Sequence, residues 1–248
     1  MIEIYSKIKA QAQFIASQFP EPNFYNDLSW AADISNNVFY NDSIIRNLIN
    51  FTEPQLAYNK GHGMLHATKV AIDAGSLIAT EGKLVNYSES YILRQIVCAQ
   101  CAGILHDTKR KEKDHALKGA VLAKKILRNH PFSSQEIDNI CIAIRNHEAF
   151  KSTIESVSSE GLLISNCLYD ADKFRWGPDN FTDTIWEMAL YANIQPKDFI
   201  KMYPKGMDTI LKIKSTFRSN TGKKYGPQFI EIGIKIGKAL YEFIISQF

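Results

Sequence analysis

Apolar residues recur at spacings of three and four along almost the whole chain, whereas strictly alternating runs of apolar and polar residues are few. This spacing places apolar side chains on one face of a helix, so it predicts an all-α protein. The predicted helices cover residues 1–18, 41–50, 63–80, 88–105, 114–128, 134–147, 161–174, 181–192, 196–216 and 226–247.

Turn signals fall between these segments, as in FPEPN at 19–23, EGK at 81–83, NHPFSSQE at 129–136 and WGPDN at 176–180. In the third of these, Ser133 and Glu136 have the spacing of a capping box that starts a helix. None of the turns resembles a domain linker, and the sequence shows neither an internal repeat nor a low-complexity segment. We therefore expect one helical domain over residues 1–248, with a helical N-terminal extension over residues 1–50.

The composition is that of a globular protein, with 45% hydrophobic and 22% charged residues among 248. The net charge of +3 is small for a protein that binds a nucleic acid polymer, so any anionic partner is expected to be small. The N-terminus lacks a signal pattern, and charged residues interrupt the apolar C-terminus. We expect a cytoplasmic protein with no membrane span, and no feature of the composition predicts its oligomeric state.

The four cysteines show no framework spacing, which favours reduced thiols over disulfides. Cys98 and Cys101 form a C-x-x-C pattern inside the apolar stretch IVCAQCAGIL. We interpret both as small core residues rather than as a redox or zinc motif.

The segment RQIVCAQCAGILHD, residues 94–107, is mostly apolar or small before it ends in His106 and Asp107. An imidazole and a carboxylate at the end of a buried helix need a partner, and a metal ion suits both. Neighbouring helical residues point about 100° apart, so the two can bind one ion most easily where the helix ends. A second feature is the pair His62 and His66, whose i,i+4 spacing places both on one helical face.

With His66, the pair His106–Asp107 and Asp172 in YDADKFRW, the sequence resembles the HD-domain metal-dependent phosphohydrolase superfamily. The stretches HATKV, AGILHD, DHALKGAVLAKKIL, AIRNHE and DADKF resemble the corresponding segments of that family over residues 58–175. The resemblance implies an HD-type helical core over this range, with the helices of 176–248 packed on it. It also implies that these four residues hold a divalent ion that activates water against a nucleotide or another small phosphate ester.

The resemblance assigns His115 and His147 to a second ion or to contacts with the phosphate, and with two ions Asp107 would bridge them. The cofactor would be one or two ions of Mn, Fe, Co, Ni, Zn or Mg, among which the sequence does not choose. In the alternative interpretation both histidines lie at helix ends or in solvent. Asp170 and Asp172 are two residues apart and face different directions on a helix, and the resemblance selects Asp172.

Four basic residues are candidates for binding the phosphate of the substrate: Lys69, Arg110, Lys173 and Arg175. The frequent family continuation is His-Asp-x-Gly-Lys, whereas this chain has HDTKR, with Arg110 at the position of the lysine. A guanidinium suits an oxyanion, so Arg110 can still bind phosphate. The alternative for Arg110 is a solvated basic turn. For Lys173 and Arg175, which flank Asp172, the alternative is a charged helix end. No Gly-Tyr-Pro motif points to the cyclic-dinucleotide branch of the family.

His62 is a candidate general acid, because HGMLHATKV resembles the Tyr-His-Asn-x-x-His segment of HD-type cyclic nucleotide phosphodiesterases. In that segment the first histidine protonates the leaving oxygen and the second binds metal. The chain departs from the pattern, since Gly63 replaces the asparagine and Tyr58 is displaced. The alternative is that His62 caps the helix that follows it.

Two other functions remain open from the sequence. One is an HD-fold diiron oxygenase that resembles inositol oxygenase, for which His66, His106, Asp107, His115, His147 and Asp172 supply four His and two Asp. The other is a helical module without catalytic activity that keeps a structural or sensing metal centre.

Overall fold

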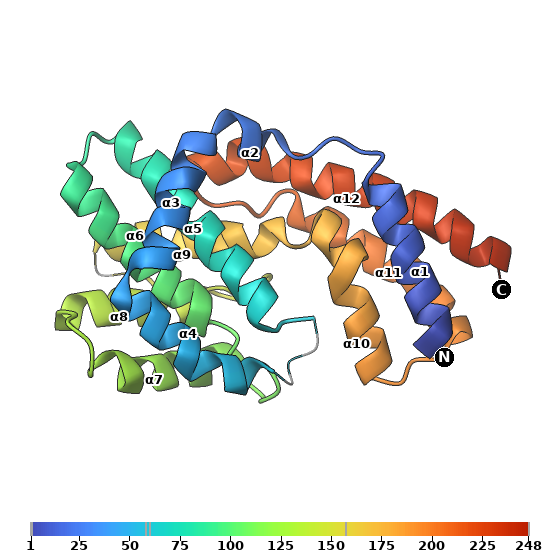
Figure 1. Ribbon diagram of the computed structural model, residues 1–248, viewed down its shortest axis with the longest axis horizontal. Coiled ribbons are helices and arrows are strands. Elements are labelled where there is room, and N and C mark those ends of the chain that lie inside the picture. Colours follow the sequence, from blue (N-terminus) through green and yellow to red (C-terminus); the bar gives the residue numbers. More distant parts are fainter. Residues whose placement is uncertain (1, 58, 60, 157, 248) are drawn as a thin grey trace.

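The computed structural model describes residues 2–57, 59, 61–156 and 158–247, and within these ranges the chain forms helices and no strand. Figure 1 shows their arrangement. In order they are α1 (Ile2–Ala16), α2 (Asn23–Asp27), α3 (Ser29–Asn41), α4 (Ser43–Leu56), α5 (Met64–Leu84), α6 (Glu89–Leu105), α7 (His115–Leu127), α8 (Ser134–Arg145), α9 (Ser159–Phe174), the π-helical turn η1 (Asn180–Thr184), α10 (Ile185–Tyr191), α11 (Pro196–Ile213) and α12 (Asn220–Gln247).

Helices α5, α6 and α9 form the centre of the molecule, with α3 and α8 packed against them (Figure 1). The apolar faces of α5 and α6 meet very closely at Gly103, where a Cβ would lie 2.6 Å from the Ala71 Cα. Only glycine permits this approach, because any larger side chain would push the two backbones apart. The close packing matters for the site, since α5 begins and α6 ends at the same end of the pair.

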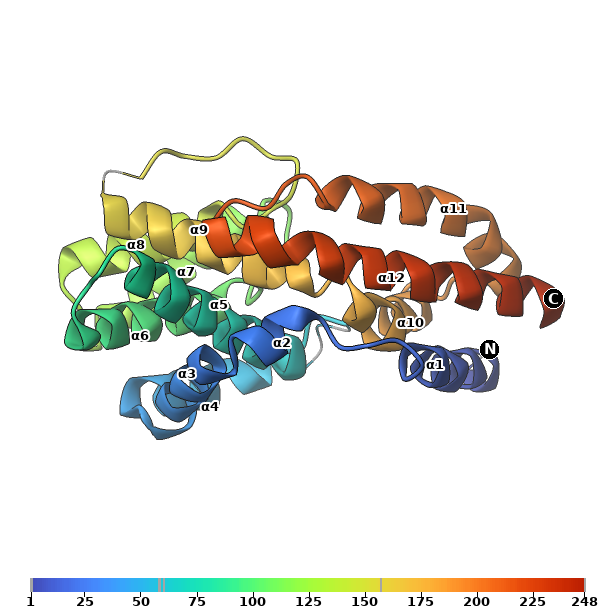
Figure 2. The ribbon, with the colours of Figure 1, turned by 90° about the horizontal axis from the view of Figure 1, so that it is seen from above.

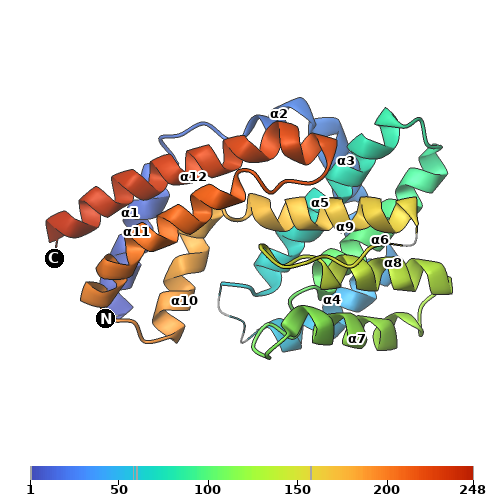
Figure 3. The ribbon, with the colours of Figure 1, turned by 180° about the vertical axis from the view of Figure 1, so that it is seen from behind.

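The N-terminal 50 residues divide between two parts of the molecule (Figures 2 and 3). Helices α3 and α4 pack on α5 and α6, whereas α1 packs on η1, α10 and α12. Tyr5 fixes α1 by donating its hydroxyl to the Ile194 carbonyl at 3.0 Å and by packing on the ring of Trp186. Both termini consequently lie at the same end of the molecule in all three views.

The predicted all-α class is confirmed, and so is the capping box of α8, where Ser133 and Glu136 exchange side-chain and backbone hydrogen bonds. Cys98 and Cys101 are buried, free thiols, in agreement with their interpretation as core residues. None of the described helices is long and apolar enough to cross a membrane.

The predicted turn EGK at 81–83 is wrong, because α5 continues to Leu84. Gly82 is buried against Ile92, and the Glu81 carboxylate accepts hydrogen bonds from the Thr221 amide and hydroxyl, both at 2.6 Å, at the start of α12. These tertiary contacts thus keep residues 81–83 helical, although the glycine and the charges of this triplet favour a turn. The sequence also failed to predict α2 and α3, and it ended α4 too early, before Pro54.

Candidate metal centre

Helix ends deliver the histidines and aspartates to one place. His66 lies in the first turn of α5, and His106 caps the C-terminus of α6 with Asp107 directly after it. His115 begins α7, and Asp172 lies in the last turn of α9. The structure therefore brings together residues that are more than a hundred positions apart in the sequence.

Four side chains form a first group. The Nε2 atom of His66 lies 3.3 Å from Nε2 of His106 and 3.3 Å from Oδ1 of Asp172. The Oδ2 atom of Asp107 lies 3.4 Å from the His106 Nε2 and 3.9 Å from the His66 Nε2. All four residues are buried.

The other oxygen of Asp107 faces a second group. Its Oδ1 lies 3.5 Å from Nε2 of His147 and 3.7 Å from Nε2 of His115, and these two nitrogens are 3.3 Å apart. Asp107 therefore presents one carboxylate oxygen to each group. The two groups share this residue and form one continuous cluster.

Backbone carbonyls set the tautomers of two histidines. The Nδ1 atom of His106 lies 2.7 Å from the Gly103 carbonyl oxygen, and Nδ1 of His147 lies 2.6 Å from the Ile144 carbonyl oxygen. A carbonyl only accepts, so each Nδ1 carries the proton and donates it. In this tautomer of the neutral ring the Nε2 atoms face the cluster, which is how metal-binding histidines are commonly oriented.

Burial controls the charge of the imidazoles. It lowers the pKa of His66 to about 4, and it lowers the pKa of His115, where the neighbouring His147 adds to the effect. For His106 burial also acts to lower the pKa, but the charge of Asp107 outweighs it and the net shift is upward. At neutral pH His66 and His115 are therefore neutral.

The carboxylates stay ionised although they are buried. Burial acts to raise the pKa of Asp107, but the charge and hydrogen bond of His106 outweigh it and hold that pKa well below its usual range. The same holds for Asp172, where the largest opposing contribution is the charge of Lys173. Neutral His66 and His115 beside ionised carboxylates are in the protonation states that metal binding requires.

Two further observations favour a cation in this cluster. Among the described residues, Asp107 Oδ1 and His62 Nδ1 are buried without a hydrogen-bond partner, a situation that usually costs about 1–3 kcal/mol. With metal–nitrogen bonds of about 2.1 Å, two ligands of one ion lie about 3–3.5 Å apart. The three sets His62–His66–Asp107, His66–His106–Asp172 and Asp107–His115–His147 each have their ligand atoms close enough for one ion. The residues fit a metal site, and they do not identify the metal.

Asp170 points elsewhere. Its carboxylate accepts hydrogen bonds from the Arg218 amide at 2.8 Å, the Ser219 amide at 2.8 Å and the Ser219 hydroxyl at 2.7 Å. These contacts bind the start of α12 and leave Asp172 as the only one of the two carboxylates that faces the histidines. The geometry thus follows the expectation that residues two apart on a helix face different directions.

His62 lies at the edge of the cluster, in the loop before α5. Its Nδ1 is 3.0 Å from Asp107 Oδ2 without forming a hydrogen bond with it. His62 does not cap α5, because Gly63 occupies the N-cap position without a side-chain cap. Its displaced neighbour Tyr58 lies outside the described residues.

Two contacts fix this loop. The Asn59 side-chain amide donates to the Asp107 carbonyl at 3.0 Å. Gly61 has a φ of +75°, its amide donates to Glu187 at 2.7 Å, and a Cβ there would lie 2.8 Å from the Thr184 carbonyl oxygen. A residue with a side chain would be strained at this position and would collide with η1, so glycine holds the loop of His62 against η1 and α10.

Of the four basic candidates, Arg110 comes nearest to the second group, with its guanidinium 3.0 Å from Nε2 of His115 and 3.8 Å from Asp107 Oδ1. The Lys173 ammonium contacts Asp172 and is buried. Both residues are in position to contact an anion beside the cluster. Their assignment to substrate binding stays a prediction.

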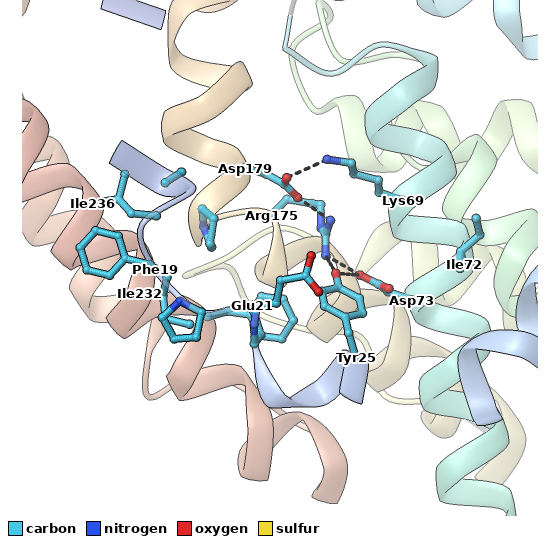
Figure 4. Close-up of a pocket in the computed structure, with 15 residues that line it drawn as sticks. Phe19, Glu21, Tyr25, Lys69, Ile72, Asp73, Arg175, Asp179, Ile232 and Ile236 are labelled. Carbon is cyan, nitrogen blue, oxygen red and sulfur yellow. Dashed lines mark hydrogen bonds and ion pairs between the residues drawn. The ribbon is translucent and has the colours of Figure 1, made fainter. Parts of the chain in front are cut away.

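Lys69 and Arg175 are bound instead to acidic side chains of the protein (Figure 4). The Lys69 ammonium is 2.7 Å from Asp179, and the buried Arg175 guanidinium is 2.5 Å from the same carboxylate. Arg175 also contacts Asp73 and donates to the Tyr25 hydroxyl at 2.7 Å. These ion pairs form a wall beside His66, and their charges are already compensated within the protein.

A cavity of about 470 Å³ opens over the cluster. His62, His66, Asp107 and Asp172 line it together with the apolar side chains of Phe150, Trp176, Ile185, Met188 and Ile210 and with polar residues that include Glu148, Asn180, Thr184 and Thr209. Phe150 has a φ of +61°, which is rare for a bulky side chain, and such backbone outliers cluster at functional sites. The cavity therefore combines the charged residues of the cluster with a lining that is partly apolar.

The sequence did not identify several of the residues that shape the site. Asp179 had a usable signal, because it lies four residues after Arg175, the spacing of a helical ion pair. Asn59, Phe150 and Trp176 had none, since a loop amide or an aromatic residue looks the same in sequence wherever it packs.

Comparisons of the chain with protein-family models, with curated proteins and with solved structures found no match. What the site does is therefore inferred from its own geometry and chemistry.

Proposed function

We propose that the protein is a divalent-metal-dependent phosphohydrolase of the HD-domain type that acts on a nucleotide or another small phosphate ester. The observation that carries the proposal is the position of Asp107, which gives one carboxylate oxygen to each of two histidine groups inside one cavity. The segment from α5 to α9 would form the HD core, since these helices and the residues directly after them supply both groups. Each group can hold one ion.

His66, His106, Asp107 and Asp172 would hold the first ion, and Asp107, His115 and His147 the second. A bound divalent ion supplies Lewis-acid polarisation of the phosphoryl group and a water of lowered pKa.

The chain's own residues orient the substrate and move the protons. Arg110 and Lys173 flank the cluster and provide donors for phosphate oxygens, the guanidinium as a fork and the ammonium as a point charge. His62 faces the cavity beside Asp107 and can give a proton to a leaving alkoxide, a role that contributes about 10²–10⁴-fold to a rate.

Metal content and turnover of one pair of variants test the proposal. His106→Ala removes a buried Nε2 from the first group, whereas His130→Ala removes a histidine from the bend before α8, outside the cluster. Wild type and His130→Ala should retain metal by elemental analysis and release phosphate from a panel of nucleotides, sugar phosphates, cyclic nucleotides and p-nitrophenyl esters with Mn, Ni or Co. His106→Ala should lose both metal and turnover. Full metal retention in His106→Ala would show that the ligand assignment is wrong, and tight metal binding without turnover on the whole panel would favour the metal module without catalytic activity.

His62 has a separate test. His62→Asn should keep its metal and should slow hydrolysis of alkyl phosphates far more than that of p-nitrophenyl phosphates, because nitrophenolate leaves without a proton. Equal slowing of both substrate classes, or no slowing, would exclude His62 as the general acid.

The convergence of four histidines and two aspartates also matches the diiron oxygenase alternative, and this observation justifies one more measurement. Iron-loaded protein should consume no oxygen in the presence of the phosphate esters that it hydrolyses. Oxygen consumption that depends on an added substrate, without release of phosphate, would contradict the phosphohydrolase function and support the oxygenase function.

A further inference from the structure

An apolar groove adjoins the cavity over the cluster. The groove has a volume of about 310 Å³ and runs along η1, α10 and α11. Five residues line both spaces: Asn180, Ile185, Met188, Gly206 and Ile210. The two spaces are thus neighbours that share a wall, with the His/Asp cluster at one end and the groove at the other.

The lining of the groove is almost free of polar side chains. Among the described lining residues only Asn180 and Tyr203 carry polar side-chain atoms, and the Tyr203 hydroxyl is already donated to the Gly237 carbonyl at 2.9 Å. The remaining side chains are aliphatic, aromatic or methionine. A ligand in the groove would therefore find hydrophobic contacts and almost no hydrogen bonds.

Two methionines at the groove are unusually exposed, Met188 by 45% and Met202 by 59%. Exposed apolar grooves of this kind mark binding sites, and methionine adapts its shape to apolar ligands. Because the groove shares lining residues with the cavity over the cluster, a substrate held at the cluster by its phosphate would have the groove beside its remaining part.

We propose that the substrate is a phosphate ester with an extended apolar group, whose phosphate lies at the His/Asp cluster and whose chain lies in the groove between α10 and α11. The inference rests on the proposed function for the placement of the phosphate. Arg110 and Lys173 at the inner end and the apolar groove at the outer end match the two ends of such a molecule.

Gly206 permits a sharp test. It lies within α11 and lines both spaces, and a Cβ at this position would meet no atom within 4 Å. A Cβ can therefore be added at this position without displacing any atom, and because Gly206 lines both spaces, a larger side chain there would take up room between them. Gly206→Trp should block the passage, Gly206→Leu should narrow it, and Gly206→Ala is the matched control.

The measurement is the dissociation constant of n-alkylphosphonates, from ethyl to decyl, determined by calorimetry on the metal-loaded protein. Phosphonates lack the ester bond, so binding is measured without turnover. In wild type and Gly206→Ala each added methylene should tighten binding by about three- to fourfold until the groove is filled, from about 0.8 kcal/mol per buried methylene. In Gly206→Trp this dependence should disappear, while ethylphosphonate binds all variants equally and the metal content stays that of wild type.

The outcomes separate this inference from the proposed function. If wild type binds phosphonates of all chain lengths with equal affinity, the inference is wrong even if short esters are hydrolysed. It is also wrong if the dependence of affinity on chain length is retained in both Gly206→Trp and Gly206→Leu. Equally tight binding of n-alkanols would also overturn it, because the phosphate would then contribute nothing. The expected dependence on chain length together with no hydrolysis of any alkyl phosphate would support the groove and contradict the phosphohydrolase.

Discussion

Replacing Asp172 by Asn should abolish the stabilisation of the protein by metal, whereas replacing Asp170 by Asn should weaken the fold and leave that stabilisation intact. The two carboxylates lie two residues apart on α9 and are both buried. Asp172 faces His66, and Asp170 binds the start of α12 through Arg218 and Ser219. The pair is therefore a matched test of which carboxylate belongs to the site.

The structure sets the size of each effect. Asp170 accepts three hydrogen bonds, and Asn in its place turns one of the two acceptor oxygens into an NH2 group, so that at least one interior donor is left without an acceptor and about 1–3 kcal/mol is expected. For a domain of this size each kcal/mol moves the unfolding midpoint by about 2–4 °C, so Asp170→Asn should lower it by roughly 2–12 °C. At a metal concentration about 1,000 times the dissociation constant, wild type gains about 4 kcal/mol from metal. Loss of a ligand from the site should remove most of this gain.

The assay is thermal unfolding of chelated and metal-reloaded protein, followed by circular dichroism. Wild type and Asp170→Asn should show the same increase of the midpoint on reloading, although the second starts from a lower value. Asp172→Asn should show no increase. If Asp172→Asn keeps the metal-dependent increase and Asp170→Asn loses it, the ligand on α9 has been assigned to the wrong carboxylate.

Two further predictions concern the supporting helices. Gly103→Ala should destabilise the protein by about 1–3 kcal/mol in urea unfolding and lower its metal content, because the added Cβ would collide with Ala71 and separate the helices that carry the first histidines; unchanged stability would show that α5 and α6 can move apart freely. Glu136→Gln should destabilise the protein at pH 7 but hardly at low pH, because the hydrogen bond of Arg94 lowers the pKa of Glu136. The Glu136 carboxylate contributes to the free energy of unfolding above its ordinary pKa of 4.5, and this contribution is lost as the pH falls through the lowered pKa of the folded protein. A difference in stability between variant and wild type that does not change with pH would contradict this reasoning.

Two kinds of sequence information led to the residues of the cluster: a local signal indicated His106 and Asp107, and the resemblance to the HD-domain family selected His66, His115, His147 and Asp172. An imidazole and a carboxylate at the end of an apolar helix are conspicuous, and helical spacing alone separates the direction of Asp170 from that of Asp172. The helices that carry them are long and strongly periodic, and their ends lie within a few residues of the predicted ones. Local pattern and tertiary position agree at these points.

Features that depend on distant contacts were not predictable. EGK looks like a turn, and it is helical only because Gly82 packs on Ile92 and Glu81 caps a helix 140 residues later. The groove is equally hidden, since Met188 and Gly206 show no sign in the sequence that α10 and α11 leave space between them. Hydrophobic spacing identifies which face of a helix is apolar, but not whether that face is covered.

Arg175 shows how the charges of the site balance. From the sequence it is a candidate for binding phosphate, yet together with Lys69 it faces two carboxylates, Asp73 and Asp179, so that two positive charges meet two negative ones. The cluster itself repeats this balance, because its two aspartates are matched by the neighbouring Arg110 and Lys173. Under the proposed function, a substrate phosphate with two negative charges would find no excess of positive charge in the protein alone. Its attraction to the cavity would then come from the cation that the histidines and aspartates are proposed to hold, and we expect affinity for phosphate to follow the metal content of the protein.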